Sequence, residues 1–236
     1  MKIRLLSDLH LELQDKPVQF SNFANVCILA GDIGNPFEKK YNKLLRLLSL
    51  VHDKVFVITG NHEYYNKESM LTVESKIQEL CESHDNIHYL QKSSYIYQGV
   101  RFLGCTLWTQ GEDSLAKYMN DFTQIPNFTC EKYNELFLDH STWLSRELSL
   151  TGDFSTTCVI THHLPKTQLI SPQYKDNPLN CFYASNVDIT GANICCYGHT
   201  HEANQITIDG VRFYCNPGGY ENETSNWNPN MVINIK

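Results

Sequence analysis

Aspartate, asparagine and histidine side chains recur directly behind short apolar runs of this 236-residue sequence. Five runs end in this way, and the polar segments that follow them are Ser7-Asp8-Leu9-His10, Gly31-Asp32-Ile33-Gly34-Asn35, Gly60-Asn61-His62-Glu63, His162-His163 and Gly198-His199-Thr200-His201. Mixed oxygen and imidazole ligands suit manganese, iron or zinc better than calcium or magnesium. The pattern therefore indicates a metal centre assembled from the ends of several strands.

The candidate ligands are too many for one tetrahedral zinc ion. They comprise two carboxylates, one amide and four imidazoles: Asp8, His10, Asp32, Asn61, His162, His199 and His201. If one carboxylate bridges two ions, each ion receives four protein contacts. Two ions about 3.5–4 Å apart can hold a hydroxide as nucleophile between them and can clamp the attacking and leaving oxygens of a phosphoryl displacement. The ligand set thus predicts a dinuclear centre whose chemistry would suit a phosphoryl displacement.

Pairs of these ligands are spaced two residues apart. Asp8 precedes His10, and His199 precedes His201, at this spacing. In an extended chain, residues i and i+2 point to the same side. We therefore expect each pair to face one side of the chain if the backbone stays extended there.

His162 and His163 compete for one ligand position. His162 directly follows the apolar run and is the expected ligand, which leaves His163 to face another ligand or the substrate. The histidines at 52, 84, 88 and 140 lie in helix-like or strand-like patterns, and we expect them to be structural or solvated.

Short strands and three longer helices must position the candidate ligands. The expected strands are Lys2–Leu6, Val26–Ala30, Val55–Thr59, Ile87–Leu90, Tyr95–Tyr97, Val100–Cys105, Thr157–Thr161, Ile194–Tyr197, Gln205–Ile208, Val211–Tyr214 and Met231–Ile235. The expected helices are Lys39–His52, Lys67–Ser83 and Cys130–Leu150. Leucines 44, 45, 47 and 48 fit one buried face of the first helix. Early strands alternate with helices and later strands cluster, which predicts an α/β fold with one large mixed sheet or two packed sheets.

The carboxyl ends of the strands are where ligand crevices lie in open α/β sheets. The candidate residues stand at those ends.

The polar stretch 110–127 is long for a connection, and we interpret it as a functional loop or as a segment that contains helix. Trp108, Tyr118 and Phe122 could form an apolar substrate wall, although buried core is the expected place for such aromatic residues. The loop 216–220 fits either a border of the cleft or a plain turn.

Composition excludes several other classes of protein. Hydrophobic residues make up 42% of the sequence and no apolar run approaches the roughly 20 residues that a bilayer requires. The net charge of −7 argues against a nucleic-acid or anionic-membrane binder, which needs a basic face. It does not exclude an anionic substrate held by metal cations.

The nine cysteines form no C-x-x-C pair, so neither a zinc knuckle nor a disulfide scaffold is expected. The simplest compartment is a reducing cytosol, which predicts a cytoplasmic protein. We see no Gly/Ser linker, charge block or repeat, and one domain over residues 1–236 is expected.

The ordered motifs D-x-H, G-D-x-x-N, G-N-H-E, T-H-H and G-H-x-H resemble those of the calcineurin-like metallophosphoesterase superfamily, and they extend from residue 7 to residue 201. The resemblance implies a four-layer sandwich of two mixed sheets flanked by helices, and phosphate-ester hydrolysis by two metal ions. It gives one metal the ligands Asp8, His10, Asp32 and His201, and the other Asp32, Asn61, His162 and His199. His62 would be the catalytic histidine that meets the substrate phosphate without binding metal. Glu63, Tyr64 and Tyr65 would support the ligands or line the cleft.

The protein serine/threonine phosphatases of this superfamily carry G-D-x-x-D-R-G, from which this sequence departs. Asn35 stands in place of the second aspartate, and no arginine follows. An amide at this position could hold the His62 ring but would supply no charge, so we expect His62 to be more often neutral. The missing arginine removes a bidentate phosphate clamp. Both departures favour a small-molecule phosphatase or phosphodiesterase over a protein phosphatase.

Two further alternatives are a catalytically inactive binding scaffold and a nuclease of the same superfamily. The complete ligand set weighs against the scaffold, because an inactive site would be expected to lose ligands. The negative net charge weighs against the nuclease.

Overall fold

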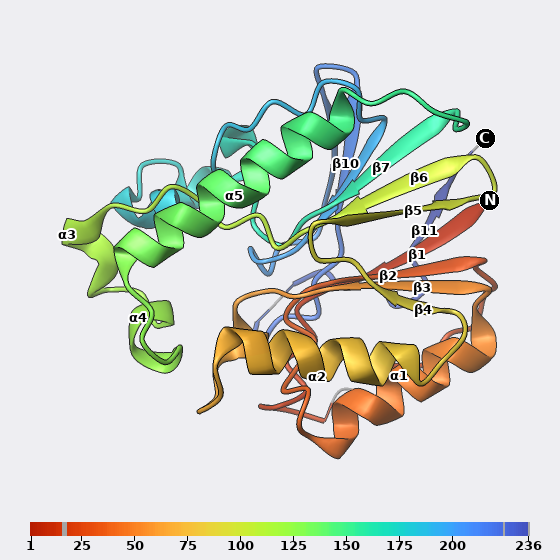
Figure 1. Ribbon diagram of the computed structural model, residues 1–236, viewed down its shortest axis with the longest axis horizontal. Helices are drawn as coiled ribbons and strands as arrows, with labels where there is room; N and C mark the ends of the chain where they lie inside the picture. Colours follow the sequence, from red (N-terminus) through yellow and green to blue (C-terminus); the bar gives the residue numbers. More distant parts are fainter. Residues whose placement is uncertain (16–17, 224, 236) are drawn as a thin grey trace.

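Two β-sheets packed face to face form the centre of the computed structural model, which describes residues 1–15, 18–223 and 225–235 (Figure 1). The described strands are β1 (Lys2–Leu6), β2 (Val26–Ala30), β3 (Lys54–Ile58), β4 (Ile87–Tyr89), β5 (Ser93–Tyr97), β6 (Val100–Gly104), β7 (Thr156–Ile160), β8 (Ile194–Tyr197), β9 (Asn204–Ile208), β10 (Val211–Cys215) and β11 (Val232–Asn234). The first sheet has the order β11-β1-β2-β3-β4 and the second the order β5-β6-β7-β8-β10-β9.

Most of the inner strands run parallel, and the antiparallel pairings lie at the edges, where β11 pairs with β1, β5 with β6 and β9 with β10. Strands that are buried on both faces read as continuous apolar runs, and the Val-Cys-Ile-Leu-Ala sequence of β2 is an example. Between the sheets, Phe56 of β3 packs against Phe102 of β6, with ring centroids 4.3 Å apart. The prediction of two packed mixed sheets is confirmed.

Helices cover the outer faces of both sheets. The α-helices are α1 (Lys39–Val51), α2 (Met70–Glu82), α3 (Asp113–Ala116), α4 (Asp121–Gln124) and α5 (Cys130–Leu148). Short 3₁₀ helices are η1 (His62–Tyr64), η2 (Thr167–Leu169), η3 (Pro172–Tyr174) and η4 (Pro178–Phe182). Helices α1 and α2 lie over the first sheet and α5 lies over the second, which gives the four expected layers (Figure 1).

The buried face of α1 differs in one residue from the prediction. Leu44, Leu45 and Leu48 are buried, whereas Leu47 is 40% exposed. Leu47 lies roughly 110° around the helix from the centre of the buried face at 3.6 residues per turn. Including Leu47 among the buried leucines was therefore wrong.

The stretch 110–127 contains the two short helices α3 and α4, at the end of the sandwich opposite the chain termini (Figure 1). Its aromatic residues separate by depth. Trp108, just before it, is fully buried, Phe122 packs against the core, and Tyr118 is 63% exposed. The expectation of a buried core position was therefore wrong for Tyr118.

The two ends of the described chain lie beside one another. The Met1 amino group donates a hydrogen bond to the Ile235 carbonyl over 2.9 Å, and the Ile235 N–H donates one to the Met1 carbonyl over 2.9 Å.

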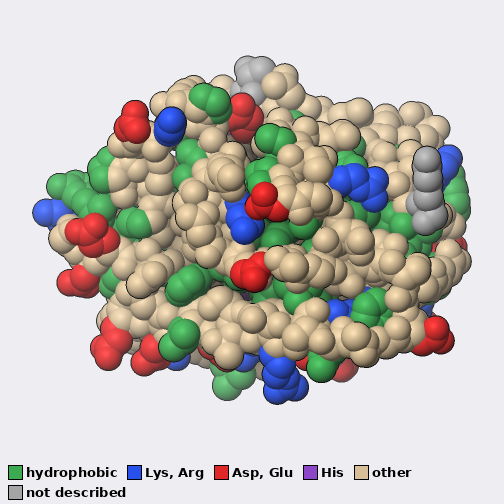
Figure 2. Space-filling model, turned by 90° about the horizontal axis from the view of Figure 1, so that it is seen from above, with side chains coloured by type: hydrophobic (Ala, Val, Ile, Leu, Met, Phe, Trp, Pro, Cys, Tyr) green, Lys and Arg blue, Asp and Glu red, His purple; other side chains and the backbone are tan. Residues whose placement is uncertain are grey.

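On the face shown in Figure 2, lysine and arginine side chains are spread among other residues and do not form one basic patch. No helix in the described ranges is both long and apolar enough to cross a bilayer. All nine cysteines carry free thiols.

Candidate metal centre

The seven candidate ligands follow the carboxyl ends of β1, β2, β3, β7 and β8, and the fold brings them together at one edge of the sandwich. Six of them form two neighbouring clusters, and the seventh, Asn61, lies with its Oδ1 3.1 Å from Nε2 of His162. The first contains Asp8, His10 and His201, and the second contains Asp32, His162 and His199. The nitrogen and oxygen atoms that could ligate a metal lie within 4.8 Å of one another inside each cluster.

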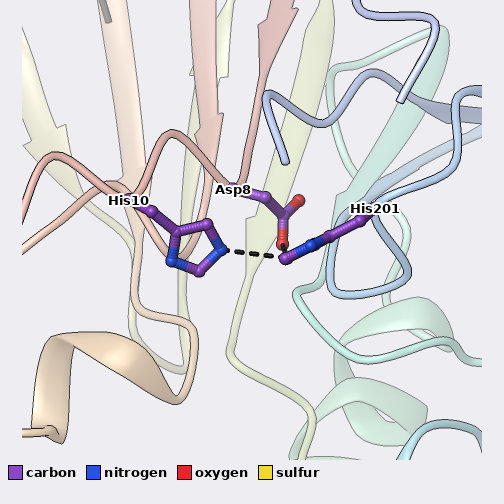
Figure 3. Close-up of side chains that lie close together, drawn as sticks. All are labelled: Asp8, His10 and His201. Atoms are coloured by element: carbon purple, nitrogen blue, oxygen red, sulfur yellow. Dashed lines mark hydrogen bonds and ion pairs between the residues drawn. The ribbon is translucent and has the colours of Figure 1, made fainter. Parts of the chain in front are cut away.

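In the first cluster, two imidazoles and a carboxylate point toward one another (Figure 3). Nε2 of His10 lies 2.9 Å from Nε2 of His201. The same His201 atom lies 3.6 Å from Oδ1 of Asp8. A small cation could be bound where these three electronegative atoms converge.

Asp32 stands between the clusters. Its Oδ2 lies 3.3 Å from Nε2 of His162 and 4.0 Å from Nε2 of His10. Its Oδ1 accepts a hydrogen bond from the His62 backbone N–H over 2.8 Å, which fixes the carboxylate. Burial alone would raise the pKa of Asp32, but the neighbouring His162 and His62 hold it well below its usual value. This geometry suits a carboxylate shared by two ions.

The donor atoms fit divalent cations. Oδ2 of Asp8 and Nε2 of His199 are buried and have no hydrogen-bond partner among the residues that the structure describes. A buried polar atom without a partner costs about 1–3 kcal/mol. Bound cations would satisfy these atoms, and the mixture of carboxylate, amide and imidazole groups suits transition metals.

Five of the seven candidate ligands have left-handed backbone conformations. Their φ angles are 51° at Asp8, 46° at His10, 54° at Asp32, 75° at His199 and 49° at His201. The expectation for the pairs spaced by two residues is conditional on an extended backbone. The backbone at these pairs is not extended. Non-glycine residues in this region cost on the order of 1–3 kcal/mol each and cluster at functional sites. The surrounding fold imposes these turns so that both members of each pair reach the centre.

Glu63 joins two of the ligand-bearing loops. Its Oε2 accepts hydrogen bonds from the backbone N–H groups of Gly60 over 2.7 Å and Asp32 over 3.0 Å. Its Oε1 accepts a third from Ile33 over 2.7 Å. This side chain supports the ligands, as the resemblance implied, and it does not line the cavity.

Asn61 is oriented by a residue that the sequence analysis missed. Nδ2 of Asn61 donates hydrogen bonds to Oδ1 of Asp121 over 2.9 Å and to Oη of Tyr65 over 3.0 Å. The Tyr65 hydroxyl donates to the same Asp121 oxygen over 2.7 Å. Oδ1 of Asn61 is thereby turned toward Nε2 of His162, at 3.1 Å. Only the unusual length of the stretch 110–127 pointed to a function for this part of the chain.

The charged partner of His62 is Glu12, and the expectation based on Asn35 was wrong. Oε1 of Glu12 lies 3.1 Å from Nδ1 of His62. Burial lowers the pKa of His62, but Asp32 and Glu12 outweigh it and raise the pKa above its ordinary value. Asn35 instead accepts a hydrogen bond from the Phe37 N–H over 3.0 Å, as a turn residue. His62 therefore has a carboxylate partner despite the altered motif.

His62 also belongs to a third possible grouping with His10 and Asp32. Both of its ring nitrogens are already engaged, however. Nδ1 meets Glu12, and Nε2 lies 3.2 Å from the hydroxyl of Tyr220. His62 therefore lies beside the two clusters, and its Nε2 faces the Tyr220 hydroxyl.

The loop 216–220 borders the site. The Tyr220 ring packs against His10 and His201, with centroids 4.5 Å and 4.6 Å away. In the same loop region, Oε2 of Glu223 lies 2.6 Å from Nδ1 of His201 and holds that ring. Of the two readings of this loop, the structure supports the border of the cleft.

His163 lies beside the second cluster. It is fully buried and packs on Trp108 and His199, with centroids 5.0 Å and 4.3 Å away. Burial and the neighbouring His162 lower the pKa of His163 to about 3. His163 therefore packs against the candidate ligand His199.

A cavity of about 370 Å³ opens next to the centre. One wall comes from residues 118–120, between α3 and α4, and another from the segment 170–183 that carries η3 and η4. Asp32, Asn61, His62, His199 and His201 lie where the cavity meets the centre.

Comparisons with known proteins agree with the fold and with the motifs. Residues 1–234 match the model of the calcineurin-like phosphoesterase superfamily domain. The chain is 28% identical to uncharacterized protein L509 of Acanthamoeba polyphaga mimivirus, an alignment that covers 99% of this chain and 96% of that protein.

Two solved structures of similar fold are a phosphopantetheinyl hydrolase from Mycobacterium tuberculosis and a dimetal phosphatase from Danio rerio. The first has a TM-score of 0.72 at 18% identity and covers 95% of this chain and 93% of its own. The second has a TM-score of 0.51 at 14% identity and covers 92% and 87%. With the family match over nearly the whole sequence, the conclusion is that this chain belongs to the calcineurin-like phosphoesterase superfamily.

Proposed function

We propose that the protein hydrolyses phosphate esters of small molecules, as a phosphatase or a phosphodiesterase, with two divalent ions of manganese, iron or zinc. The observation that carries this proposal is the position of Asp32 Oδ2 between His10, at 4.0 Å, and His162, at 3.3 Å. One ion would be held by Asp8, His10, Asp32 and His201. The other would be held by Asp32, Asn61, His162 and His199.

Two divalent cations so placed supply Lewis acidity that neutralises the phosphate and activates water. The remaining work falls to side chains of the protein. Asp121 and Tyr65 keep the Asn61 oxygen toward the centre. Glu12 holds Nδ1 of His62, so Nε2 would meet the phosphate or the leaving oxygen in exchange for its contact with the Tyr220 hydroxyl. His62 is the proposed catalytic residue and not a ligand.

The size of the cavity supports a small-molecule substrate. Its volume of about 370 Å³ lies within the range of roughly 300–1,000 Å³ that is typical of small-molecule sites. The cavity is bounded by two segments of the chain, which leaves less room for a folded protein partner at the phosphate. The protein-phosphatase alternative is accordingly less favoured.

Metal analysis tests the ligand assignment. After reloading with Mn²⁺, we expect about two equivalents of metal per chain. Asp32→Asn should weaken both sites together because the bridging residue serves both ions, whereas His10→Ala should mainly affect one. A firm value of one equivalent or none would contradict the dinuclear proposal.

Turnover of phenyl phosphate and bis-phenyl phosphate by the same samples tests the reaction. His62→Ala should keep about two metals and lose about 10²–10⁴-fold in kcat, the usual effect of a positioned acid–base group. Loss of metal in proportion to activity would make His62 a ligand. Two bound metals without turnover of either ester would favour a binding scaffold.

A further inference from the structure

The cavity beside the candidate metal centre has no lysine or arginine among its described lining residues. Its carboxylates are Asp32, at the centre, and Glu223, which holds His201. Lys117 lies close by in sequence, but it is exposed and its Nζ sits 5.0 Å from the ring centroid of Tyr118, outside the lining. Lys175, which follows Tyr174 in the other wall, is likewise exposed and outside the lining. Away from the centre, an anionic group in this cavity would therefore meet no cationic side chain among the described lining residues.

Tyrosine rings and amides make up much of the outer wall. The Tyr183 ring lies 4.7 Å from the ring of His199, so the wall begins directly at the second cluster. Tyr174 and Tyr118 are 53% and 63% exposed and line the cavity from its two opposing segments. Aromatic faces bind planar and apolar groups, and phenol and amide groups at the wall add hydrogen bonds of fixed direction.

The wall that carries Tyr174 is held by its own hydrogen bonds. Nδ2 of Asn180 donates to the Tyr174 carbonyl over 2.7 Å, and Oδ1 of Asn177 accepts from the Leu179 N–H over 2.9 Å. Asn120, on the opposite wall, is exposed and has no side-chain hydrogen bond recorded within the described ranges. The wall that carries Tyr174 is thus fixed by internal hydrogen bonds, and the Asn120 amide opposite it can bond to a ligand. Such an arrangement is typical of a binding surface that is formed before the ligand binds.

We propose that this cavity is a subsite for the organic group of the ester, and that it selects uncharged groups with aromatic or amide character. Esters whose organic group carries a further carboxylate or phosphate are disfavoured, because that charge would exchange part of its hydration for contacts with neutral side chains and no cation. The proposal rests on the proposed function, since it places the substrate phosphate at the metal centre.

Two matched substrates isolate this effect. Both are phenyl phosphates with a para-carboxamide arm, one ending in a primary amide and the other in a carboxylate, so that their leaving oxygens have similar basicity. We expect the carboxylate ester to have a KM at least about fivefold higher, with a smaller difference in kcat.

Asn120→Lys supplies the missing cation and should lower the KM of the carboxylate ester relative to the amide ester by roughly fivefold, the scale of one ion pair at about 4 Å in water. Asn120→Gln is the neutral control at the same position. Leu50→Lys adds the same charge near the end of α1, just before the amino end of β3, whereas the centre lies at the carboxyl ends of the strands. Neither control should change the KM ratio.

Phenyl phosphate, which lacks the arm, separates the two proposals. If the metal-loaded protein turns over neither phenyl phosphate, bis-phenyl phosphate nor either armed ester, the proposed function fails. If it turns them over but the two armed esters have KM values within twofold of each other, in wild type and in Asn120→Lys alike, the subsite is overturned.

Discussion

One oxygen atom of Glu12 contacts two histidines of the centre. Oε1 lies 3.3 Å from Nδ1 of His10 and 3.1 Å from Nδ1 of His62. Glu12 therefore links a candidate ligand to the proposed catalytic histidine and orients both rings. It follows His10 by two residues, so the first motif carries this function as well as its two ligands.

Replacement of Glu12 by glutamine should lower kcat by about 10–100-fold, the usual effect of losing a partner that orients a functional side chain. The amide can still accept a hydrogen bond from one ring, but it supplies no charge to His62. The measurement is kcat for phenyl phosphate together with metal content. Loss of metal would show that the effect passes mainly through His10.

Asn35→Asp is the matched control for Glu12→Gln. The Asn35 side chain is bound to the Phe37 N–H, so an added charge there should change kcat by less than about twofold. A large effect of Asn35→Asp with no effect of Glu12→Gln would return the orienting role to position 35.

The candidate ligands could be proposed from sequence because each stands directly behind an apolar run, where strand, turn and polar residue are local features. Glu12, Asp121 and Tyr220 could not be assigned in this way. Their functions depend on residues that they contact far away in the sequence. Glu12 and Tyr220 both contact His62, and Asp121 contacts Asn61. Such long-range pairings leave no local pattern in one sequence.

At the scale of elements, α5 is attached to the second sheet through a buried histidine. Nδ1 of His140 accepts a hydrogen bond from the Leu107 N–H over 3.1 Å, and burial lowers the pKa of His140 to about 4. In the unfolded chain this histidine would titrate near 6.5. Protonation therefore favours unfolding, so the stabilisation is complete above about pH 6.5 and is lost as the pH falls toward 4.

The free energy of unfolding should accordingly fall by about 2 kcal/mol from this group between pH 7 and pH 5. Urea unfolding of wild type and His140→Gln at both pH values, in the presence of EDTA, measures the effect. Other titrating groups act on both proteins, so the difference between them reports His140. Equal pH dependence in the two would contradict the assignment.

The long elements were predictable for a physical reason that does not extend to α3 and α4. Strands such as Val26–Ala30 are buried on both faces, and α1 and α5 carry helical periodicity over several turns. Helices α3 and α4 have four residues each, too few for a periodic pattern to show. The cavity wall is built from these elements and the 3₁₀ turns, so the ligands could be predicted but the wall could not.

At the scale of the whole molecule, the candidate metal centre joins loops from both sheets. The backbone of several candidate ligands in these loops is strained. Ligands from the first sheet, such as Asp32, meet ligands from the second, such as His162. Without metal, buried atoms that lack a partner among the described residues, such as Oδ2 of Asp8, and the left-handed turns oppose folding at this edge. Bound ions that interact only with the folded state should therefore stabilise the entire sandwich.

Mn²⁺ at about 100 times its Kd should add about 2.7 kcal/mol of stability per site, which corresponds to a rise in Tm of about 5–10 °C for each site and about 10–20 °C for both in a domain of this size. Thermal unfolding with Mn²⁺ and with EDTA measures it. Asp32→Asn should lose most of the rise, whereas Leu50→Lys, far from the ligands, should keep it. A Tm independent of Mn²⁺ in the wild type would oppose a metal centre here.

The pairing of β11 with β1 has a consequence for synthesis. Lys2 is opposite Asn234 and Arg4 is opposite Val232, so the partner of the first strand lies at the far end of the chain. At about 5–20 residues per second, on the order of 10–50 s separates their translation. During that time the outer edge of β1 has its backbone N–H and C=O groups exposed, and such an edge is a template for pairing with other chains. The nascent protein is thus open to aggregation at the strand that later presents Asp8 and His10 until β11 has left the ribosome.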